Sequence, residues 1–266
     1  MPVRKGTATV LVCALAATLA LTGCTAQRPP AAPPAPGPPR PSGPPHPQEP
    51  QEQDGRPSSA RIPAPPSPVP ARLPGLGPLT QARVPDGTTQ ALVVSGDSPD
   101  GNVATAVLYE RDPAGRWRPV AGPWTGHNAL RGWTDDHTAG DLRSPTGVYR
   151  IGDAGGRLPD PGSRIPYDED PLYAVSGTGF LGEPLEGSFD YVVAIDYNRV
   201  PGTTPLDKQR PLGDDKGGGV WIHVDHGGPT QACVALPREH MRELLRALDP
   251  GRGPVVVMGP AEVLAE

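Results

Sequence analysis

The chain has no excess of basic residues. Its 266 residues include 24 Lys and Arg against 29 Asp and Glu, which gives a formal net charge of -5. Proteins that bind nucleic acid or an anionic membrane surface through charge carry a basic patch instead. The composition therefore excludes nucleic acid as a partner, and a neutral or mixed-charge partner is expected.

Large apolar residues are almost missing from residues 29–70. This stretch holds 18 of the chain's 40 prolines, mixed with Ala, Gly, Ser, Gln and a few charged residues. Such a segment cannot bury a core, and proline favours extended polyproline geometry. We expect residues 24–75 to form a disordered tether, whose about 50 residues reach on the order of 100 Å.

Cysteine is scarce as well, and two of the three cysteines lie in what reads as an export signal. Basic residues at positions 4 and 5 precede an apolar run, Thr9–Leu21, which is short for a membrane span. The following residues, Leu21-Thr22-Gly23-Cys24, resemble a bacterial lipobox. We expect a signal peptide over residues 1–23, a lipid on Cys24 and a lipoprotein at the outer face of the cytoplasmic membrane. The alternative is an ordinary cleaved signal or an uncleaved anchor, with Cys24 incidental.

The third cysteine, Cys233, has no expected disulfide partner. Cleavage of the signal removes Cys13, and lipidation converts the sulfur of Cys24 to a thioether. An unpaired cysteine in an exported protein, where thiols tend to be oxidised, indicates chemistry at that residue.

Periodic sequence begins near residue 76. Apolar runs bounded by Gly, Pro and Asp predict short strands, and an apolar stripe after Pro237 predicts one helix. The expected fold is mainly β, a single domain over residues 76–266, with one packed helix after Cys233. Long loops over residues 152–171 and 201–219 are expected to be functional or mobile. The strands are expected at residues 89–94, 103–109, 147–151, 191–197, 220–224 and 255–258.

The segment Val220–Leu236 combines a strand, a turn and Cys233. Alternation along the strand directs His223 away from its apolar face. Gly227-Gly228-Pro229 predicts a hairpin-like return that brings Cys233 near His223, the pairing that a cysteine nucleophile needs. An adjacent imidazolium and the N-terminus of the following helix are both expected to lower the pKa of the thiol, and unpaired amides near them to form an oxyanion hole.

These residues resemble the L,D-transpeptidases, whose YkuD-type catalytic domain has a histidine on a strand followed by a [Ser/Thr]-x-Gly-Cys loop. Thr230-Gln231-Ala232-Cys233 matches that loop, and S-P-T-G-V-Y at residues 144–149 resembles the strand entry of the family. The likeness covers roughly residues 130–260. It implies a β-sandwich-like fold with Cys233 as nucleophile and His223 as general base, with Thr230 shaping the loop.

The same resemblance implies the reaction. Cys233 would form a thioester with a peptidoglycan stem peptide, releasing a terminal D-alanine, and would transfer the acyl group to an amine of another stem. Water as the acceptor would make the protein an L,D-carboxypeptidase. Carbapenems acylate the cysteine of this family. No cofactor or metal is implied.

The chain departs from the family pattern in three ways. The separation between His223 and Cys233 is shorter than in many members of the family. Ala235 stands where an arginine often follows the cysteine, and Arg199, Arg210 or Lys216 could supply a cation for the donor instead. Ala232 replaces the loop glycine. If the loop keeps a positive φ there, Ala232 is strained and Ala232→Gly speeds acylation, which is the outcome we expect. If the loop has an ordinary φ, the same change only destabilises the protein.

Other readings stay open. His226 is a rival base, although a solvated loop residue is expected at that position. A sortase-like transpeptidase would use His137, Cys233 and Arg238. A catalytically inactive, lipid-tethered wall-binding module is the alternative of another class, supported by Ala232. The cluster of His127 and His137 with nearby aspartates has no tight metal-ligand spacing, so these are expected to be solvated loop residues.

Overall fold

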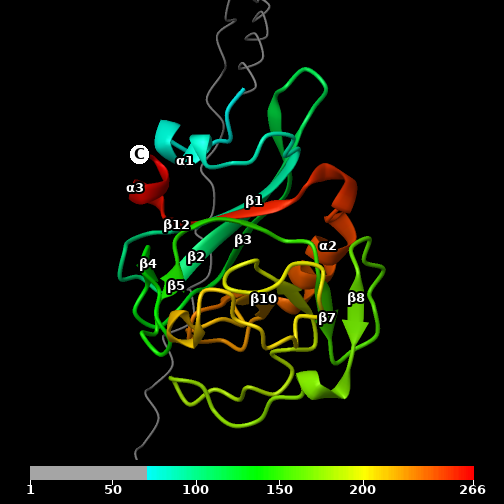
Figure 1. Cartoon of the computed structure of the whole chain (residues 1–266). Helices are drawn as coiled ribbons and strands as arrows, with labels where there is room; N and C mark the ends of the chain where they lie inside the picture. The colour runs from blue at the N-terminus through cyan, green and yellow to red at the C-terminus, as the bar shows by residue number, and fades with distance from the viewer. Residues whose placement is uncertain (1–70) are drawn as a thin grey trace, which may run out of the picture. The chain divides into compact units, whose positions relative to one another are not determined.

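Strands account for most of the regular structure in residues 71–266, the part of the chain that this computed structural model describes (Figure 1). The expected signal peptide, Cys24 and nearly all of the expected tether lie outside the described residues. The expectation of a mainly β fold with one packed helix after Cys233 is confirmed. Leu73 is buried, three residues before the boundary expected at residue 76.

Ten strands form one mixed sheet in the order β6-β12-β1-β2-β3-β11-β10-β9-β7-β8, and β4 pairs with β5 separately. Neighbours run antiparallel except for three parallel pairs in the large sheet: β1 with β12, β10 with β11, and β7 with β8. The strands are β1 Gln90–Gly96, β2 Val103–Arg111, β3 Trp117–His127, β4 Trp133–Thr134, β5 Ser144–Pro145, β6 Gly147–Arg150, β7 Ala154–Gly156, β8 Tyr167–Glu169, β9 Val192–Ala194, β10 Trp221–Val224, β11 Val234–Leu236 and β12 Val255–Pro260.

Two hydrophobic clusters cover the two faces of the central strands. Successive side chains of a strand point to opposite faces, so Leu92 of β1 enters the main cluster while Val93 enters the second. Because both faces are covered, β1 and β12 read as continuous apolar runs rather than as alternating patterns.

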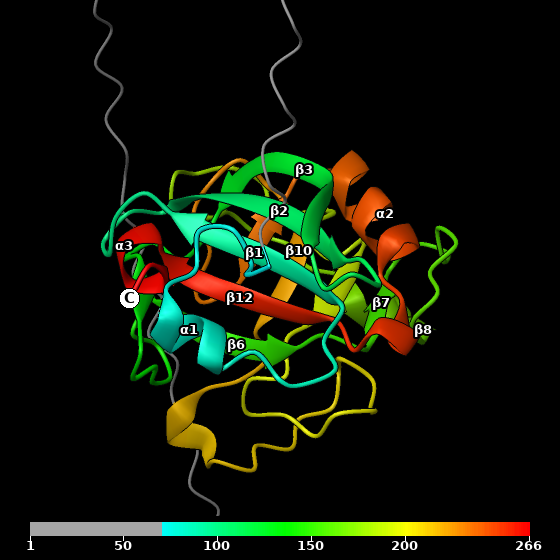
Figure 2. The same cartoon turned by 90° about the horizontal axis from the view of Figure 1, so that it is seen from above.

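Helices cover these clusters from opposite sides (Figure 2). Helix α2 (Arg238–Ala247) places Met241, Leu244 and Leu245 in the main cluster, and all three are fully buried. The short helices α1 (Pro78–Ala82) and α3 (Ala261–Leu264) lie beside β12 with the second cluster. The remaining turns are 3-10 helices at Pro171–Tyr173, Asp214–Lys216 and Pro250–Arg252.

The turn between β10 and β11 differs from the hairpin that the sequence predicts. The two strands run parallel, with Ile222 opposite Val234 and His223 opposite Ala235. Residues 225–233 therefore carry the chain back along β10 to its starting end, where β11 begins. A parallel pair of this kind aligns Cys233 with the beginning of β10 rather than with its end.

Candidate active site

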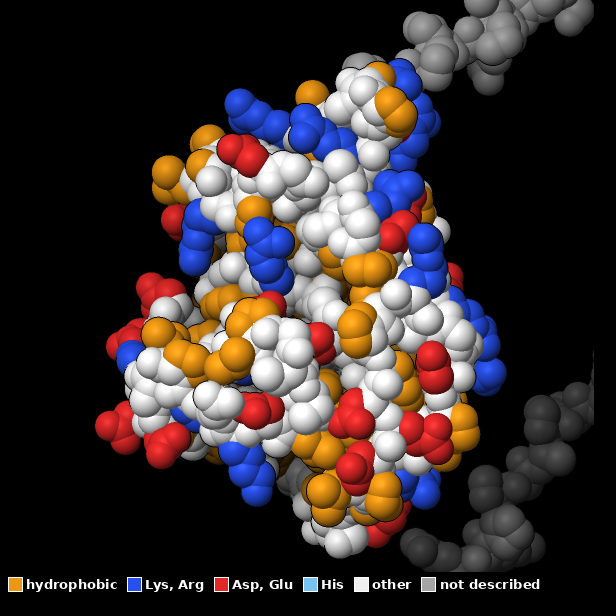
Figure 3. Space-filling model, turned by 45° about the vertical axis from the view of Figure 1, so that its right-hand side comes forward, with side chains coloured by type: hydrophobic (Ala, Val, Ile, Leu, Met, Phe, Trp, Pro, Cys, Tyr) orange, Lys and Arg blue, Asp and Glu red, His pale blue; other side chains and the backbone are white. Residues whose placement is uncertain are grey.

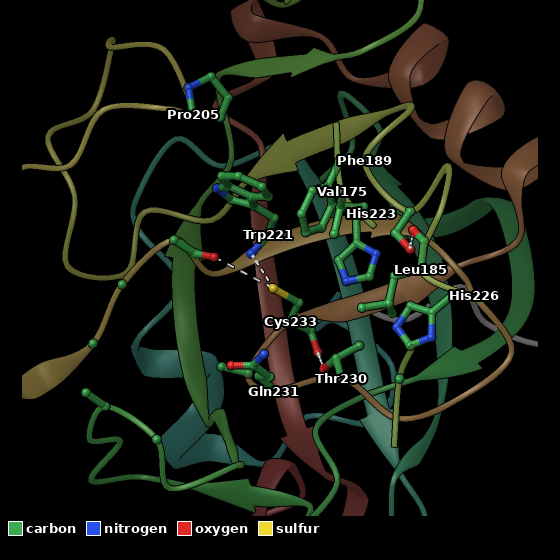
Figure 4. Close-up of a pocket in the computed structure, with 18 of the residues that line it drawn as sticks. Val175, Leu185, Phe189, Pro205, Trp221, His223, His226, Thr230, Gln231 and Cys233 are labelled. Atoms are coloured by element: carbon green, nitrogen blue, oxygen red, sulfur yellow. Dashed lines mark hydrogen bonds between the residues drawn. The ribbon is translucent and has the colours of Figure 1, made fainter. Parts of the chain in front are cut away.

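A cavity of about 710 Å³ lies where β10 and the loop before β11 meet two long loops (Figure 4). Residues 175–189 form one wall, and residues 205–219 form another. Much of the lining is apolar, including Val175, Leu185, Phe189 and Trp221, while His223 and Cys233 are also part of it. The long loop expected at residues 201–219 therefore contributes directly to the site.

His223 and Cys233 share the face of the sheet that is turned away from the main cluster. Ile222 and Val234 pack into that cluster from neighbouring strands in register. By alternation, the residues next to them, His223 on β10 and Cys233 before β11, point the other way. Both side chains are directed into the cavity (Figure 4). The predicted proximity of the two residues thus arises from parallel register, not from a hairpin.

The hydrogen bond of His223 fixes which ring nitrogen is basic. Its Nδ1 lies 2.9 Å from the carbonyl oxygen of Val224. A carbonyl only accepts, so Nδ1 carries the proton and donates it, which leaves Nε2 with a free lone pair. His223 is 3% exposed, and burial lowers its pKa from 6.5 to about 4. The imidazole is therefore neutral at pH 7 and able to accept a proton.

The thiol of Cys233 is also neutral at rest. Its Sγ lies 3.4 Å from the backbone N–H of Trp221, which donates to it, and 3.7 Å from the carbonyl oxygen of Gly219. Burial raises the pKa of the thiol to about 11, although the bond from Trp221 acts in the opposite direction. The prediction of a lowered pKa is therefore wrong for the resting protein.

Two features explain this difference. The neutral His223 supplies no positive charge. Helix α2 begins after β11, and four residues of extended chain place its N-terminus roughly 13 Å from Cys233. The field of a helix end falls off within about one turn. Neither feature therefore offsets the burial that raises the pKa of the Cys233 thiol.

Thr230 holds the loop that presents Cys233. Its Oγ1 donates to the carbonyl oxygen of Cys233 at 2.7 Å, and its N–H donates to the carbonyl oxygen of Asn128 at 2.9 Å. Ser144 donates a second hydrogen bond, of 3.2 Å, to the same Cys233 carbonyl. Sequence reasoning did not identify Ser144 as part of the site, although it is the first residue of the S-P-T-G-V-Y segment.

Ala232 adopts an ordinary backbone conformation. In residues 71–266, the non-glycine residues with positive φ are Leu142 and Asn198. The expectation that Ala232 is strained is therefore wrong, and its side chain instead packs partly against the main cluster. Within the same part of the chain, the backbone N–H groups of Gln231 and Ala232 make no hydrogen bond. Both residues line the cavity.

His226 is not the solvated residue that the sequence predicts. Its side chain is 5% exposed, and its Nδ1 lies 3.0 Å from Oε1 of Glu183. The ring stacks on that of His223, with 5.9 Å between centroids and 12° between planes. The contact between His226 and Glu183 joins the wall formed by residues 175–189 to the loop that leads to Cys233.

The residues of the sortase-like alternative are not assembled. Arg238 forms a 2.5 Å ion pair with Asp190 and is not part of the cavity lining. His137 lines the cavity but is buried, with Nδ1 3.0 Å from a carboxylate oxygen of Asp141. The solvated state expected for His127 and His137 is therefore wrong for His137, while His127 lies 3.0 Å from Asp225.

No group of three or more His, Cys, Asp or Glu side chains in residues 71–266 is arranged to hold a metal ion. In the same range, every helix is too short or too polar to cross a membrane.

Comparison with known proteins identifies the fold. The family model of YkuD, the L,D-transpeptidase catalytic domain, matches residues 90–257. This range starts at β1 and ends within β12, so it extends further toward the N-terminus than the resemblance over residues 130–260. Searches of the curated proteins and of the solved structures found no match. The family match covers more than half of the chain and includes both His223 and Cys233, and the chain therefore belongs to the YkuD family of L,D-transpeptidase catalytic domains.

Proposed function

We propose that Cys233 attacks the amide carbonyl that follows the third residue of a peptidoglycan stem peptide. Nε2 of His223 accepts the thiol proton as the carbon–sulfur bond forms. The carbon–nitrogen bond then breaks, and the amine of the departing D-alanine takes the proton from His223. The product is a thioester on Cys233.

The thioester is resolved by an amine of a neighbouring stem, which forms a cross-link between third residues. The acceptor amine loses its proton to His223, and the proton returns to the thiol as the carbon–sulfur bond breaks. Water in place of the amine gives an L,D-carboxypeptidase by the same steps. Competition between an added amine and water in one assay distinguishes these two activities.

One observation supports this proposal above the others. Cys233 and His223 leave neighbouring strands on the same face, at a cavity of about 710 Å³, with Nε2 of His223 free to act as a base. The unpaired N–H groups of Gln231 and Ala232 are the proposed oxyanion donors. The ordinary φ of Ala232 removes the argument that favoured a catalytically inactive wall-binding module.

The base is tested by comparing His223→Gln with His226→Gln in acylation by a tetrapeptide stem that ends in D-alanine. We expect His223→Gln to slow acylation about a hundredfold or more, because one general base contributes roughly that much. His226→Gln should have a much smaller effect, since its Nδ1 is engaged with Glu183. A larger loss in His226→Gln would contradict the assignment.

We also propose that the protein is a lipoprotein anchored through Cys24. The L-T-G-C tetrad at residues 21–24 supports this. Cys24→Ala should abolish lipid labelling in a bacterial host and leave precursor accumulated or protein shed. Unchanged labelling would refute the anchor without affecting the proposed chemistry.

A further inference from the structure

The cavity contains a cation that no neighbouring carboxylate neutralises. Three cations were candidates for donor recognition, because Ala235 replaces the arginine that often follows the cysteine. Arg199 is 8% exposed and donates to both Asp153 and Asp196, so it is part of the protein interior. Lys216 is paired with Asp136. Arg210 alone of the three lines the cavity.

Arg210 is held by carbonyl groups rather than by an ion pair. Its Nη1 donates to the backbone oxygens of Asp207, at 3.2 Å, and Gln209, at 2.9 Å. The Asp207 carboxylate instead accepts from the N–H of Gln209. Within residues 71–266, Arg210 has no acidic partner within ion-pair distance, and its Nε and Nη2 make no hydrogen bond. These two groups together are the donor pair that binds a carboxylate.

Three successive glycines bring this guanidinium close to the nucleophile. A Cβ on Gly218 would lie 2.1 Å from Nε of Arg210, so a larger residue at position 218 would displace the Arg210 side chain from this place. The Cβ position of Gly219 is 3.6 Å from Nη2. The carbonyl oxygen of Gly219 is in turn 3.7 Å from Sγ of Cys233. A single residue, Gly219, therefore separates the guanidinium of Arg210 from the Sγ of Cys233.

Acidic residues outnumber basic ones in the loops that line the cavity. Residues 168–219 contain ten Asp and Glu but only four Lys and Arg. Acidic side chains gather on the lower half of the face in Figure 3, the half that holds these loops in Figure 1. Such a surface repels an anionic peptide overall. Two cations line the cavity, Lys208 and Arg210, and only the planar guanidinium of Arg210 offers a carboxylate two parallel N–H groups.

We propose that Arg210 binds a carboxylate of the donor peptide and so replaces the arginine missing at position 235. This assignment rests on the proposed function. The carboxylate carbon of the departing D-alanine is three bonds from the scissile carbonyl carbon, roughly 3 to 4 Å away. That separation suits a guanidinium packed on Gly218 and Gly219. Where the third stem residue has a side-chain carboxylate, that group is the other candidate ligand of Arg210.

The first test compares three donors: one with both carboxylates free, one with a C-terminal amide and one with an amidated third residue. Arg210→Ala should raise the KM for the free donor about tenfold to a hundredfold, the effect of losing a charged hydrogen bond. Its kcat should change little, because the contact is made equally in the ground state and the transition state. Arg242→Ala, which removes one exposed charge on α2, is the matched control and should leave KM unchanged.

The wild-type protein should discriminate against one amidated donor, and Arg210→Ala should lose that discrimination. The donor concerned identifies the carboxylate. Arg210→Lys, which keeps the charge, should recover part of the affinity. Equal discrimination by the wild type and Arg210→Ala overturns the proposal, as does a fall in kcat for all donors with no change in KM.

A second test does not depend on turnover. Alkylation of Cys233 is measured with anionic iodoacetate and neutral iodoacetamide, and the modified peptide is identified by mass. Arg210→Ala should lower the ratio of the iodoacetate rate to the iodoacetamide rate severalfold, while Arg242→Ala should leave it unchanged. If no donor is turned over but the ratio falls, the proposed function fails and the anion site stands. An unchanged ratio overturns the anion site.

Discussion

The loop residue Ala232 gives a prediction whose sign is set by the backbone. Because its φ is not positive, glycine at this position relieves no strain. It only adds conformational freedom to the unfolded chain, which costs about 0.5 to 1 kcal/mol. Ala232→Gly also removes a methyl group that packs partly against the main cluster, a fraction of the ~0.8 kcal/mol of a fully buried CH₂ group.

Together these effects lower the free energy of unfolding by about 1 kcal/mol. For a folded region of nearly 200 residues, that corresponds to a fall in Tm of about 2 to 4 °C. Acylation should not be faster, because the glycine frees a loop that presents the N–H groups of Gln231 and Ala232. Ala114→Gly, in an exposed turn, is the matched control for the packing contribution and should lower Tm less.

The assay measures Tm and the rate of Cys233 acylation on the same preparations. A severalfold faster acylation with an equal or higher Tm would refute the reasoning, since that pair of results requires a strained alanine. A lower Tm with a slower or unchanged rate is the result that the ordinary φ of Ala232 predicts.

The remaining predictions concern pH and the Cys233 loop. Because the pKa of His223 is lowered to about 4, the acylation rate should stay constant as the pH is lowered to about 5 and should fall near pH 4. A fall in the rate centred near pH 6.5 would contradict a buried neutral base. The unfolded chain protonates His223 near pH 6.5, whereas the folded protein does so only near pH 4. The contribution of the neutral His223 to stability is therefore fully present above pH 6.5 and is lost as the pH falls toward 4. His223→Gln should therefore lose less stability than the wild type over that range in denaturant titrations, and an equal loss would count against the lowered pKa. Thr230→Val should cost about 1 to 2 kcal/mol in denaturant unfolding, since it removes a partly buried hydrogen bond to the Cys233 carbonyl. A cost below about 0.5 kcal/mol would show that Ser144 alone satisfies that carbonyl.

Local pattern was enough to predict the central strands. β1, β2 and β12 are apolar runs bounded by turns, and the structure contains them within a few residues of the predicted bounds. β3 was missed because its sequence includes two prolines and two glycines, which disfavour a strand. The structure accommodates them by a register shift against β2 near Leu108, where Gly122 adopts a φ of +89°.

The site shows the same division between local and distant information. The pairing of His223 with Cys233 follows from the chemistry of a cysteine nucleophile and from short sequence separation. The burial that sets their pKa values comes from segments far along the chain, such as Phe189, whose ring packs against that of His223. Likewise, the partner of His226 is Glu183, 43 residues away. No local pattern carries that information.

The proposed role of Cys233 is that of an acylated nucleophile. Its most direct test is the intact mass of the full chain after incubation with a carbapenem, compared with Cys233→Ser and followed by peptide mapping. We predict one adduct, located on Cys233 and absent from Cys233→Ser. No adduct on the wild-type protein, or an adduct retained by Cys233→Ser, would contradict the account.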